Sequence, residues 1–274
     1  MAIDSAVEGL LRRDRWVVLA MLSAVIVASW AYVLAGAGMG MSAFEMTRMS
    51  GMPQPAGGMA DMAMAPAAWS PGYAAVMFVM WWVMMVAMML PGATPMILLY
   101  AAVQRRQRAQ GNPYVPTSLF AASYLLAWAG FSLAAVALHW LLDRAGLLST
   151  GMTVTSYLIG AAILIAAGLY QLTPLKQACL RHCRMPAQYL AEHWRPGPGG
   201  GVAMGLRHGA YCLGCCWFLM LLLFFGGIMN LYWIAGLALY VLIEKLLPVG
   251  HWLDYAVGVL LLGAGLWLAL AAAM

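Results

Sequence analysis

Residues 202–229 read VAMGLRHGAYCLGCCWFLMLLLFFGGIM, a largely apolar run with a histidine and three cysteines in its first half. The run exceeds the roughly 20 residues that a transmembrane helix needs. At 3.6 residues per turn, His208, Cys212, Cys215 and Cys216 stand at i, i+4, i+7 and i+8 and share one face about 100° wide. Gly205 and Gly209 flank this face and allow a neighbouring backbone to approach. The stretch therefore predicts a membrane helix with thiols along one side.

The composition of the whole chain predicts a polytopic membrane protein. It is 65% hydrophobic and 8% charged, whereas about a quarter of the residues of a soluble domain are charged. Because lipid offers no hydrogen bonds to the backbone, we expect an all-α membrane helix bundle. The net charge of +5 does not predict nucleic-acid binding, because the basic residues separate by membrane side.

Seven apolar runs are expected to cross the membrane. They cover residues 16–38, 73–103, 117–142, 152–172, 202–229, 231–246 and 253–273. If the N-terminus lies inside, then of 14 Lys and Arg residues only Arg48 and Arg144 fall outside, as the positive-inside rule requires. We therefore expect seven transmembrane helices in the inner membrane of a bacterial cell, with the N-terminus in and the C-terminus out. A signal peptide is the alternative for the first run, which is longer than a usual signal core.

This topology predicts three parts of the chain. Residues 1–38 form a cytoplasmic N-terminus and the first helix, 39–70 a Met-rich external loop, and 71–274 a six-helix membrane domain with a cytoplasmic Cys-containing loop at 173–201. Thioethers of the external loop suit Cu(I). A flexible apolar loop lying on the membrane surface is the alternative.

A methionine stripe marks the second apolar run. Met77, Met84 and Met88 fall within about 40° of one another on a helix, and Met89 lies at the edge of the stripe. We expect the three to line an approach from the outer surface, with plain core packing as the alternative.

A second cysteine group lies in the predicted inner loop. Cys179 and Cys183 stand at i, i+4 on a short helix, with His182 beside them. The Pro- and Gly-rich residues 196–201 predict a flexible tether, so we expect both cysteine groups to form one site. The basic residues expected to stabilise its thiolates are Lys176, Arg181, Arg184 and Arg207. We interpret Glu244 and Lys245 as an ion pair at the membrane interface.

These motifs together resemble the bacterial DUF2182 family, described as predicted metal-binding integral membrane proteins. The resemblance covers most of the chain from about residue 70 to the end, and implies metal binding. It rests on Met80-Trp81 to Met88-Met89-Leu90-Pro91, Gln171-Leu172-Thr173-Pro174-Leu175-Lys176 with Cys179 and Cys183-Arg184, the segment from His208 to Trp217, Met229-Asn230 and Glu244-Lys245.

The leading functional hypothesis is the transport or delivery of a soft metal, copper as Cu(I), to a membrane or periplasmic protein. Zinc is the alternative metal. The candidate ligands are Cys179, Cys183, Cys212, Cys215, Cys216, His182, His208, Met77, Met84 and Met88. We do not expect an enzyme or a nucleic-acid partner. We do expect the lipid bilayer as a partner. Two alternatives remain: a membrane thiol-disulfide oxidoreductase that uses the CxxCC motif at 212–216, and a structural or assembly protein.

Overall fold

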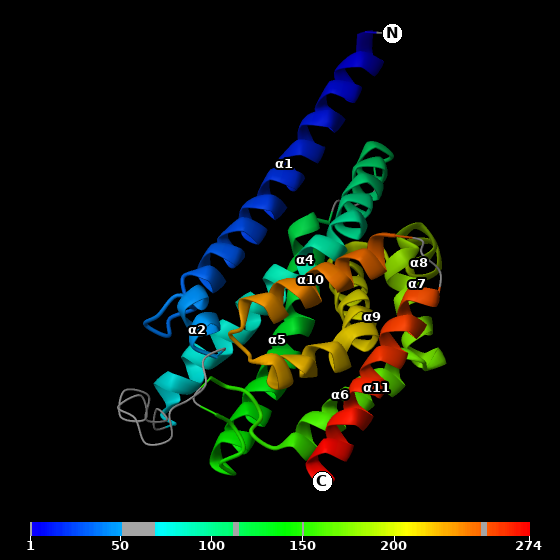
Figure 1. Ribbon diagram of the computed structural model, residues 1–274. Coiled ribbons are helices and arrows are strands. Elements are labelled where there is room, and N and C mark those ends of the chain that lie inside the picture. The colour runs from blue at the N-terminus through cyan, green and yellow to red at the C-terminus, as the bar shows by residue number, and fades with distance from the viewer. Residues whose placement is uncertain (1, 51–68, 112–114, 150, 248–250) are drawn as a thin grey trace.

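The computed structural model describes residues 2–50, 69–111, 115–149, 151–247 and 251–274. Their regular structure is helical, apart from one isolated β-bridge between Leu148 and Val154, so the predicted all-α class is confirmed. Figure 1 labels the elements. The helices are α1 (Ala2–Leu34), α2 (Ala43–Ser50), α4 (Pro71–Ala109), α5 (Thr117–Arg144), α6 (Tyr157–Gln171), α7 (Pro174–Arg184), α8 (Pro186–His193), α9 (Gly197–Gly226), α10 (Leu231–Leu246) and α11 (Trp252–Ala273).

Five of these helices are long and apolar enough to cross a membrane, namely α4, α5, α9, α11 and the part of α1 from Arg15 onward. The two other predicted spans, 152–172 and 231–246, form shorter helices than these five, and only the first of them differs from its expected bounds. Helix α6 has 15 residues because Ser156 caps it, its hydroxyl accepting from Ile159 N at 3.4 Å, and α10 has 16. Helices α6 and α7 meet at an angle of 65°. Taken together, this bent pair is long and apolar enough to be a sixth span.

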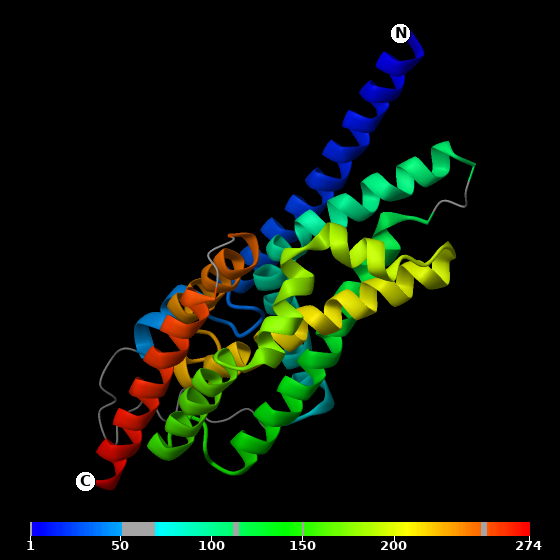
Figure 2. The same ribbon diagram turned by 90° about the vertical axis from the view of Figure 1, so that its right-hand side faces the viewer.

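Helices α4 and α9 form the centre of the bundle. They carry most of the large buried side chains, whereas α1 and α11 leave much of their apolar surface exposed. Helix α11 packs along α6 through glycines: a Cβ added at Gly168 would lie 2.8 Å from the carbonyl oxygen of Gly258. The start of α1 and the end of α11 lie at opposite ends of the molecule (Figures 1 and 2).

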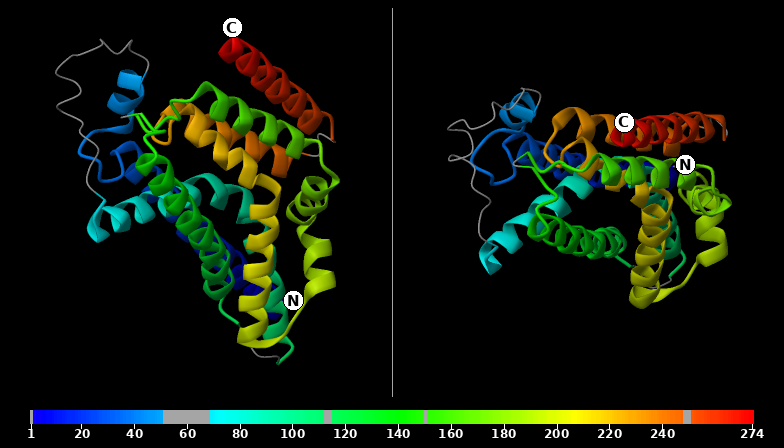
Figure 3. Two further views of the ribbon diagram at one scale, coloured as in Figure 1. Left: turned by 90° about the horizontal axis from the view of Figure 1, so that it is seen from below. Right: turned by 60° about the horizontal axis from the view of Figure 1, so that its bottom comes forward.

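Helix α4 continues through Pro91 and Pro95 without an unwound turn. Each proline removes one backbone donor, and the hydroxyl of Thr94 donates to the carbonyl of Leu90 at 3.0 Å. The helix changes direction along its length (Figure 3), as the two prolines predict.

The structure differs from the sequence expectation at two segments. Residues 197–201 begin helix α9 instead of forming a flexible tether, since Pro198 suits the first turn of a helix. In the segment predicted to be an external loop, residues 43–50 form α2, whose start is a reciprocal cap between Ser42 and Glu45. The rest of the Met-rich segment, 51–68, lies outside the described residues.

Candidate metal centre

Helix α9 buries three thiols in the middle of the bundle. Cys212 is 1% exposed, and Cys215 and Cys216 are fully buried. Both later thiols donate back to the carbonyl oxygen of Cys212, at 3.0 Å from Cys215 and 2.9 Å from Cys216. The three cysteines therefore lie on the face of α9 that is buried in the bundle, as their spacing predicts.

Glycines on α9 let two neighbouring helices approach these thiols. A Cβ added at Gly209 would lie 2.6 Å from Ala127 Cβ on α5, and one added at Gly214 would lie 2.8 Å from the sulfur of Cys179 on α7. Tyr170 of α6 also donates its hydroxyl to the carbonyl of Gly214. Without side chains at these positions, α5 and α7 can pack directly against the cysteine-bearing part of α9.

Two side chains from α4 and α10 meet the thiols of α9. Lys245 Nζ lies 2.9 Å from the sulfur of Cys212 and 3.8 Å from the thioether of Met89. The thiol of Cys216 lies 3.8 Å from the same Met89 sulfur. On the α5 side, the hydroxyl of Tyr124 lies 3.1 Å from the sulfur of Cys212 and donates to the carbonyl of Met89 at 3.3 Å. We call Cys212, Cys216, Met89 and Lys245 the sulfur–lysine cluster.

The thiols of α7 join this region from the other side. Cys183 is close enough to interact through its side chain with Cys212 and Cys215, and Cys179 lies against Gly214. Both α7 cysteines are partly buried. The structure thus brings the two predicted cysteine groups together by direct packing of α7 on α9.

The two histidines among the predicted ligands lie among aromatic rings. His208 is buried, with its ring 5.7 Å from that of Tyr124 and 5.4 Å from that of Tyr189, and its Nδ1 has no hydrogen-bond partner. His182 stacks on Tyr211 with ring centres 3.9 Å apart, and its Nδ1 lies 2.8 Å from the carbonyl oxygen of Ala178. Burial raises the pKa of Tyr189, so its hydroxyl stays protonated and donates to the carbonyl of Met204 at 2.8 Å.

The predicted methionine stripe lies in the core. Met77, Met84 and Met88 are all buried. The methionine whose sulfur reaches a thiol is Met89, which the sequence placed only at the edge of the stripe. A helical wheel of α4 does not show which neighbouring helix each face contacts. Only the packing of α4 against α9 and α10 identifies Met89 as the methionine near the thiols.

The described residues contain no metal site that is built only from His, Cys, Asp or Glu side chains. Within the part of the chain that the structure describes, no three His, Cys, Asp or Glu side chains are grouped to hold a metal ion. A tetrahedral zinc site needs four such ligands. The sulfur–lysine cluster instead combines thiols with a thioether, which is the donor type that selects Cu(I).

The expected ion pair between Glu244 and Lys245 does not form. Both are buried, and adjacent residues on a helix do not face each other. Glu244 pairs with Lys176 of α7, and Lys245 turns toward Cys212. The sequence predicted that Lys176 would be one of the cations beside the thiols. In the structure, the lysine beside Cys212 is Lys245.

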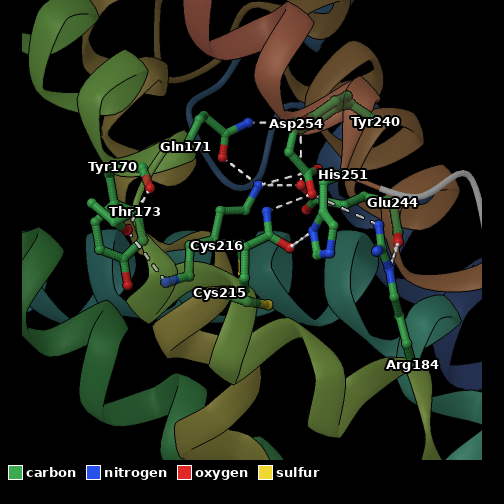
Figure 4. Close-up of polar contacts among 12 residues, drawn as sticks. Tyr170, Gln171, Thr173, Arg184, Cys215, Cys216, Tyr240, Glu244, His251 and Asp254 are labelled. Atoms are coloured by element: carbon green, nitrogen blue, oxygen red, sulfur yellow. Dashed lines mark hydrogen bonds and ion pairs between the residues drawn. The ribbon is translucent and has the colours of Figure 1, made fainter.

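Lys176 belongs to a separate buried polar network around α7, α10 and α11. Figure 4 shows Gln171, Glu244 and Asp254 pointing toward one another. Lys176 bonds Gln171 and Glu244 and lies 3.6 Å from Asp254. Arg184 donates through Nε to the carbonyl of Glu244 at 2.7 Å. Asp254, an acid in the first turn of the last apolar helix, is not among the residues predicted from the sequence.

A family model for PpoB2, described as a copper chaperone, matches residues 78–268, which is more than half of the chain. The chain belongs to the PpoB2 family of copper chaperones. No curated protein and no solved structure matches it. The PpoB2 match includes the cysteines of α7 and α9, Met89 and Lys245, and leaves out α1 and α2. The copper assignment expected from the thiols and thioethers therefore agrees with the family.

Proposed function

We propose that this PpoB2-family protein is a membrane-embedded Cu(I) chaperone that holds copper at the sulfur–lysine cluster and passes it to a membrane or periplasmic protein. The observation that carries the proposal is the meeting of Cys212, Cys216 and Met89 around one buried cation, Lys245. Thiolates and a thioether are soft ligands that favour Cu(I). Cys183 and Cys215 lie next to the cluster and offer further thiolates for receiving or releasing the ion.

Charge balance supports Cu(I) at this position. A buried charge is costly unless it is compensated. Two thiolates carry two negative charges, which Cu(I) and the ammonium of Lys245 together neutralise. With Zn²⁺ in the same place, the two thiolates and Lys245 would leave one positive charge uncompensated. The lysine therefore favours a monovalent metal.

We further propose the inner membrane of a bacterial cell as the location, with seven crossings, the N-terminus in and the C-terminus out. In support, the arginine-bearing N-terminal end of α1 and C-terminal end of α4 lie at one end of the molecule (Figure 2). In this topology, helix α6 would cross the membrane together with α7 as one bent span, and the 16-residue helix α10 would cross alone. The external segment 39–70 and the buried Met77, Met84 and Met88 would then offer weaker thioether sites on the way to the thiols.

The test is metal analysis of the full chain, purified in detergent under reducing conditions after loading with Cu(I). We expect one tightly held copper per chain, with sulfur neighbours in X-ray absorption. Cys212→Ser should lose it. Met220→Leu is the matched control, because Met220 is a buried methionine of the same helix and not a member of the cluster. Equal copper in Cys212→Ser and the control would refute the proposal.

A thiol-disulfide oxidoreductase remains the alternative, because Lys245 beside Cys212 is also a setting that stabilises a reactive thiolate. All five cysteines are free. A reversible Cys212–Cys215 disulfide with no bound copper would favour the alternative. A structural or assembly role would be favoured if the protein shows neither copper nor a disulfide.

A further inference from the structure

A cavity of about 820 Å³ lies between α7, α10 and the start of α11 and shares one residue, Lys245, with the sulfur–lysine cluster. This volume is within the range of small-molecule sites. The side chains that define its chemistry are Arg181, Arg184, Lys245, His251 and Gln177, and no Asp or Glu is among the described residues that line it. Such a lining attracts an anion.

One of the arginines is held ready for a ligand. Arg184 is fixed through Nε, which donates to the carbonyl of Glu244 at 2.7 Å. Its Nη2 forms an ion pair with Asp254, whose oxygen is 3.9 Å away and too far for a hydrogen bond, so this buried nitrogen has no hydrogen-bond partner among the described residues. Buried donors are normally satisfied. An oxygen of an anionic ligand in the cavity would satisfy this one.

The histidine of the cavity is oriented by the neighbouring network. The carboxylate of Asp254 can only accept, so the amide nitrogen of Gln177 donates to it at 2.8 Å. The amide oxygen of Gln177 then accepts from His251 Nδ1 at 2.8 Å. This arrangement fixes the ring of His251 and leaves its Nε2 for a ligand. The cavity wall is therefore ordered before any ligand binds.

Lys245 connects the cavity with the cysteines. It is a lining residue of the cavity, and its ammonium lies 2.9 Å from the sulfur of Cys212. Lys245 therefore belongs both to the wall of the cavity and to the surroundings of Cys212. An anion bound to Arg181 and Arg184 could place a sulfur of its own close to the metal-binding thiol.

We propose that this cavity binds a small carboxylate-bearing thiol that exchanges Cu(I) with Cys212. The inference rests on the proposed function. In the exchange, the bond between copper and the sulfur of the carrier breaks, and a bond between copper and Cys212 Sγ forms. Cys212 enters as the thiolate paired with the ammonium of Lys245. Copper also bonds the sulfur of Cys216, and the proton of the Cys216 thiol passes to the sulfur of the departing carrier. Copper stays Cu(I) throughout, so no oxidant or reductant is needed, and the reverse exchange is equally balanced.

Binding is tested without copper, on the full chain in detergent micelles. The probe is S-methylglutathione, which has the carboxylates of a small thiol but no free sulfhydryl. We expect saturable binding by calorimetry, weakened roughly tenfold or more by Arg181→Gln or by Arg184→Gln, since each removes a charge-assisted hydrogen bond. Arg195→Gln is the matched control, because Arg195 is exposed and does not line the cavity. Arg181 is also exposed, so its variant should fold normally.

A second measurement separates this inference from the proposed function. In Cu(I) transfer from reduced glutathione, Arg181→Gln should slow loading and leave the final copper content unchanged. Cys212→Ser should abolish copper loading and keep binding of the S-methyl probe. Absence of probe binding, or equal binding by Arg181→Gln and wild type, would overturn the inference while leaving copper binding intact. Loss of probe binding in nanodiscs with phosphatidylglycerol, compared with phosphatidylcholine, would assign the cavity to an anionic lipid instead.

Discussion

The ammonium of Lys245 lies 2.9 Å from the sulfur of Cys212, inside the helix bundle. It comes from α10, whereas the thiol comes from α9. A lysine is almost never buried without a partner, and here the partners are sulfur atoms. The cation therefore sets the charge that the proposed copper site can carry.

Lys245→Met should weaken Cu(I) binding by roughly tenfold to a hundredfold, the value of a hydrogen bond to a charged group. Without the ammonium, a copper ion with two thiolates would keep one uncompensated negative charge. The measurement is competition with a colourimetric Cu(I) chelator. Lys245→Arg retains the charge and should lose less. Unchanged affinity in Lys245→Met would show that the lysine does not compensate the bound metal.

Met89→Leu should lower the affinity for Cu(I), because it removes a thioether that lies 3.8 Å from the sulfur of Cys216. The affinity should fall by roughly tenfold or more, which is the smallest effect expected when a group that supports a metal ligand is removed. Packing should change little, because Leu and Met have similar volumes. The comparison is the triple variant Met77→Leu, Met84→Leu, Met88→Leu. It should slow copper loading and leave the equilibrium affinity as it is. Equal affinities for Met89→Leu and wild type would remove Met89 from the site.

Cys183→Ser and Cys212→Ser should each reduce copper binding, and the double variant should be little worse than either alone. Residues that share a site give non-additive losses, and the structure brings the side chains of Cys183 and Cys212 together. Cys179→Ser should behave in the same way if all α7 thiols take part. Additive losses in the affinity titration would instead indicate two separate sites.

Part of this site could be predicted from the sequence. The spacing from Cys212 to Cys216 predicts one buried face, because positions on a single helix follow from its period. Met89 and Lys245 could not be found in that way, since their neighbours belong to other helices. One signal was available: Glu244 and Lys245 are adjacent in the chain and therefore point in different directions.

The fold shows the same division. Length and hydropathy predict the long helices α4, α5 and α9 within a few residues. They fail at residues 152–156, where a turn precedes the cap at Ser156, and at residues 197–201, which form the first turn of α9. Both outcomes depend on contacts. Val154 donates to the carbonyl of Phe224 at 2.9 Å, and a Cβ at Gly201 would lie 2.9 Å from the hydroxyl of Tyr100.

Lys176→Met should destabilise the fold by about 3–5 kcal/mol, because it leaves the buried carboxylate of Glu244 without its ion-pair partner. Glu244→Gln should destabilise it as well. The double variant should be more stable than Lys176→Met alone, since Arg184 and Asp254 still balance each other. Thermal unfolding in detergent measures all three. If the single variants lose nothing, the pair does not stabilise the bundle.

The topology decides from which side copper reaches the thiols. Reporter fusions after residues 65, 110, 148 and 190 should be outside, inside, outside and inside, because this arrangement leaves only Arg48 and Arg144 outside, as the positive-inside rule requires. A fusion after Met274 should be outside if the 16 residues of α10 complete a crossing. An inside result there would mean that α10 does not cross. An outside result after residue 190 would place α7 and the cavity on the outer side, and the carboxylate-bearing thiol would then have to come from that compartment.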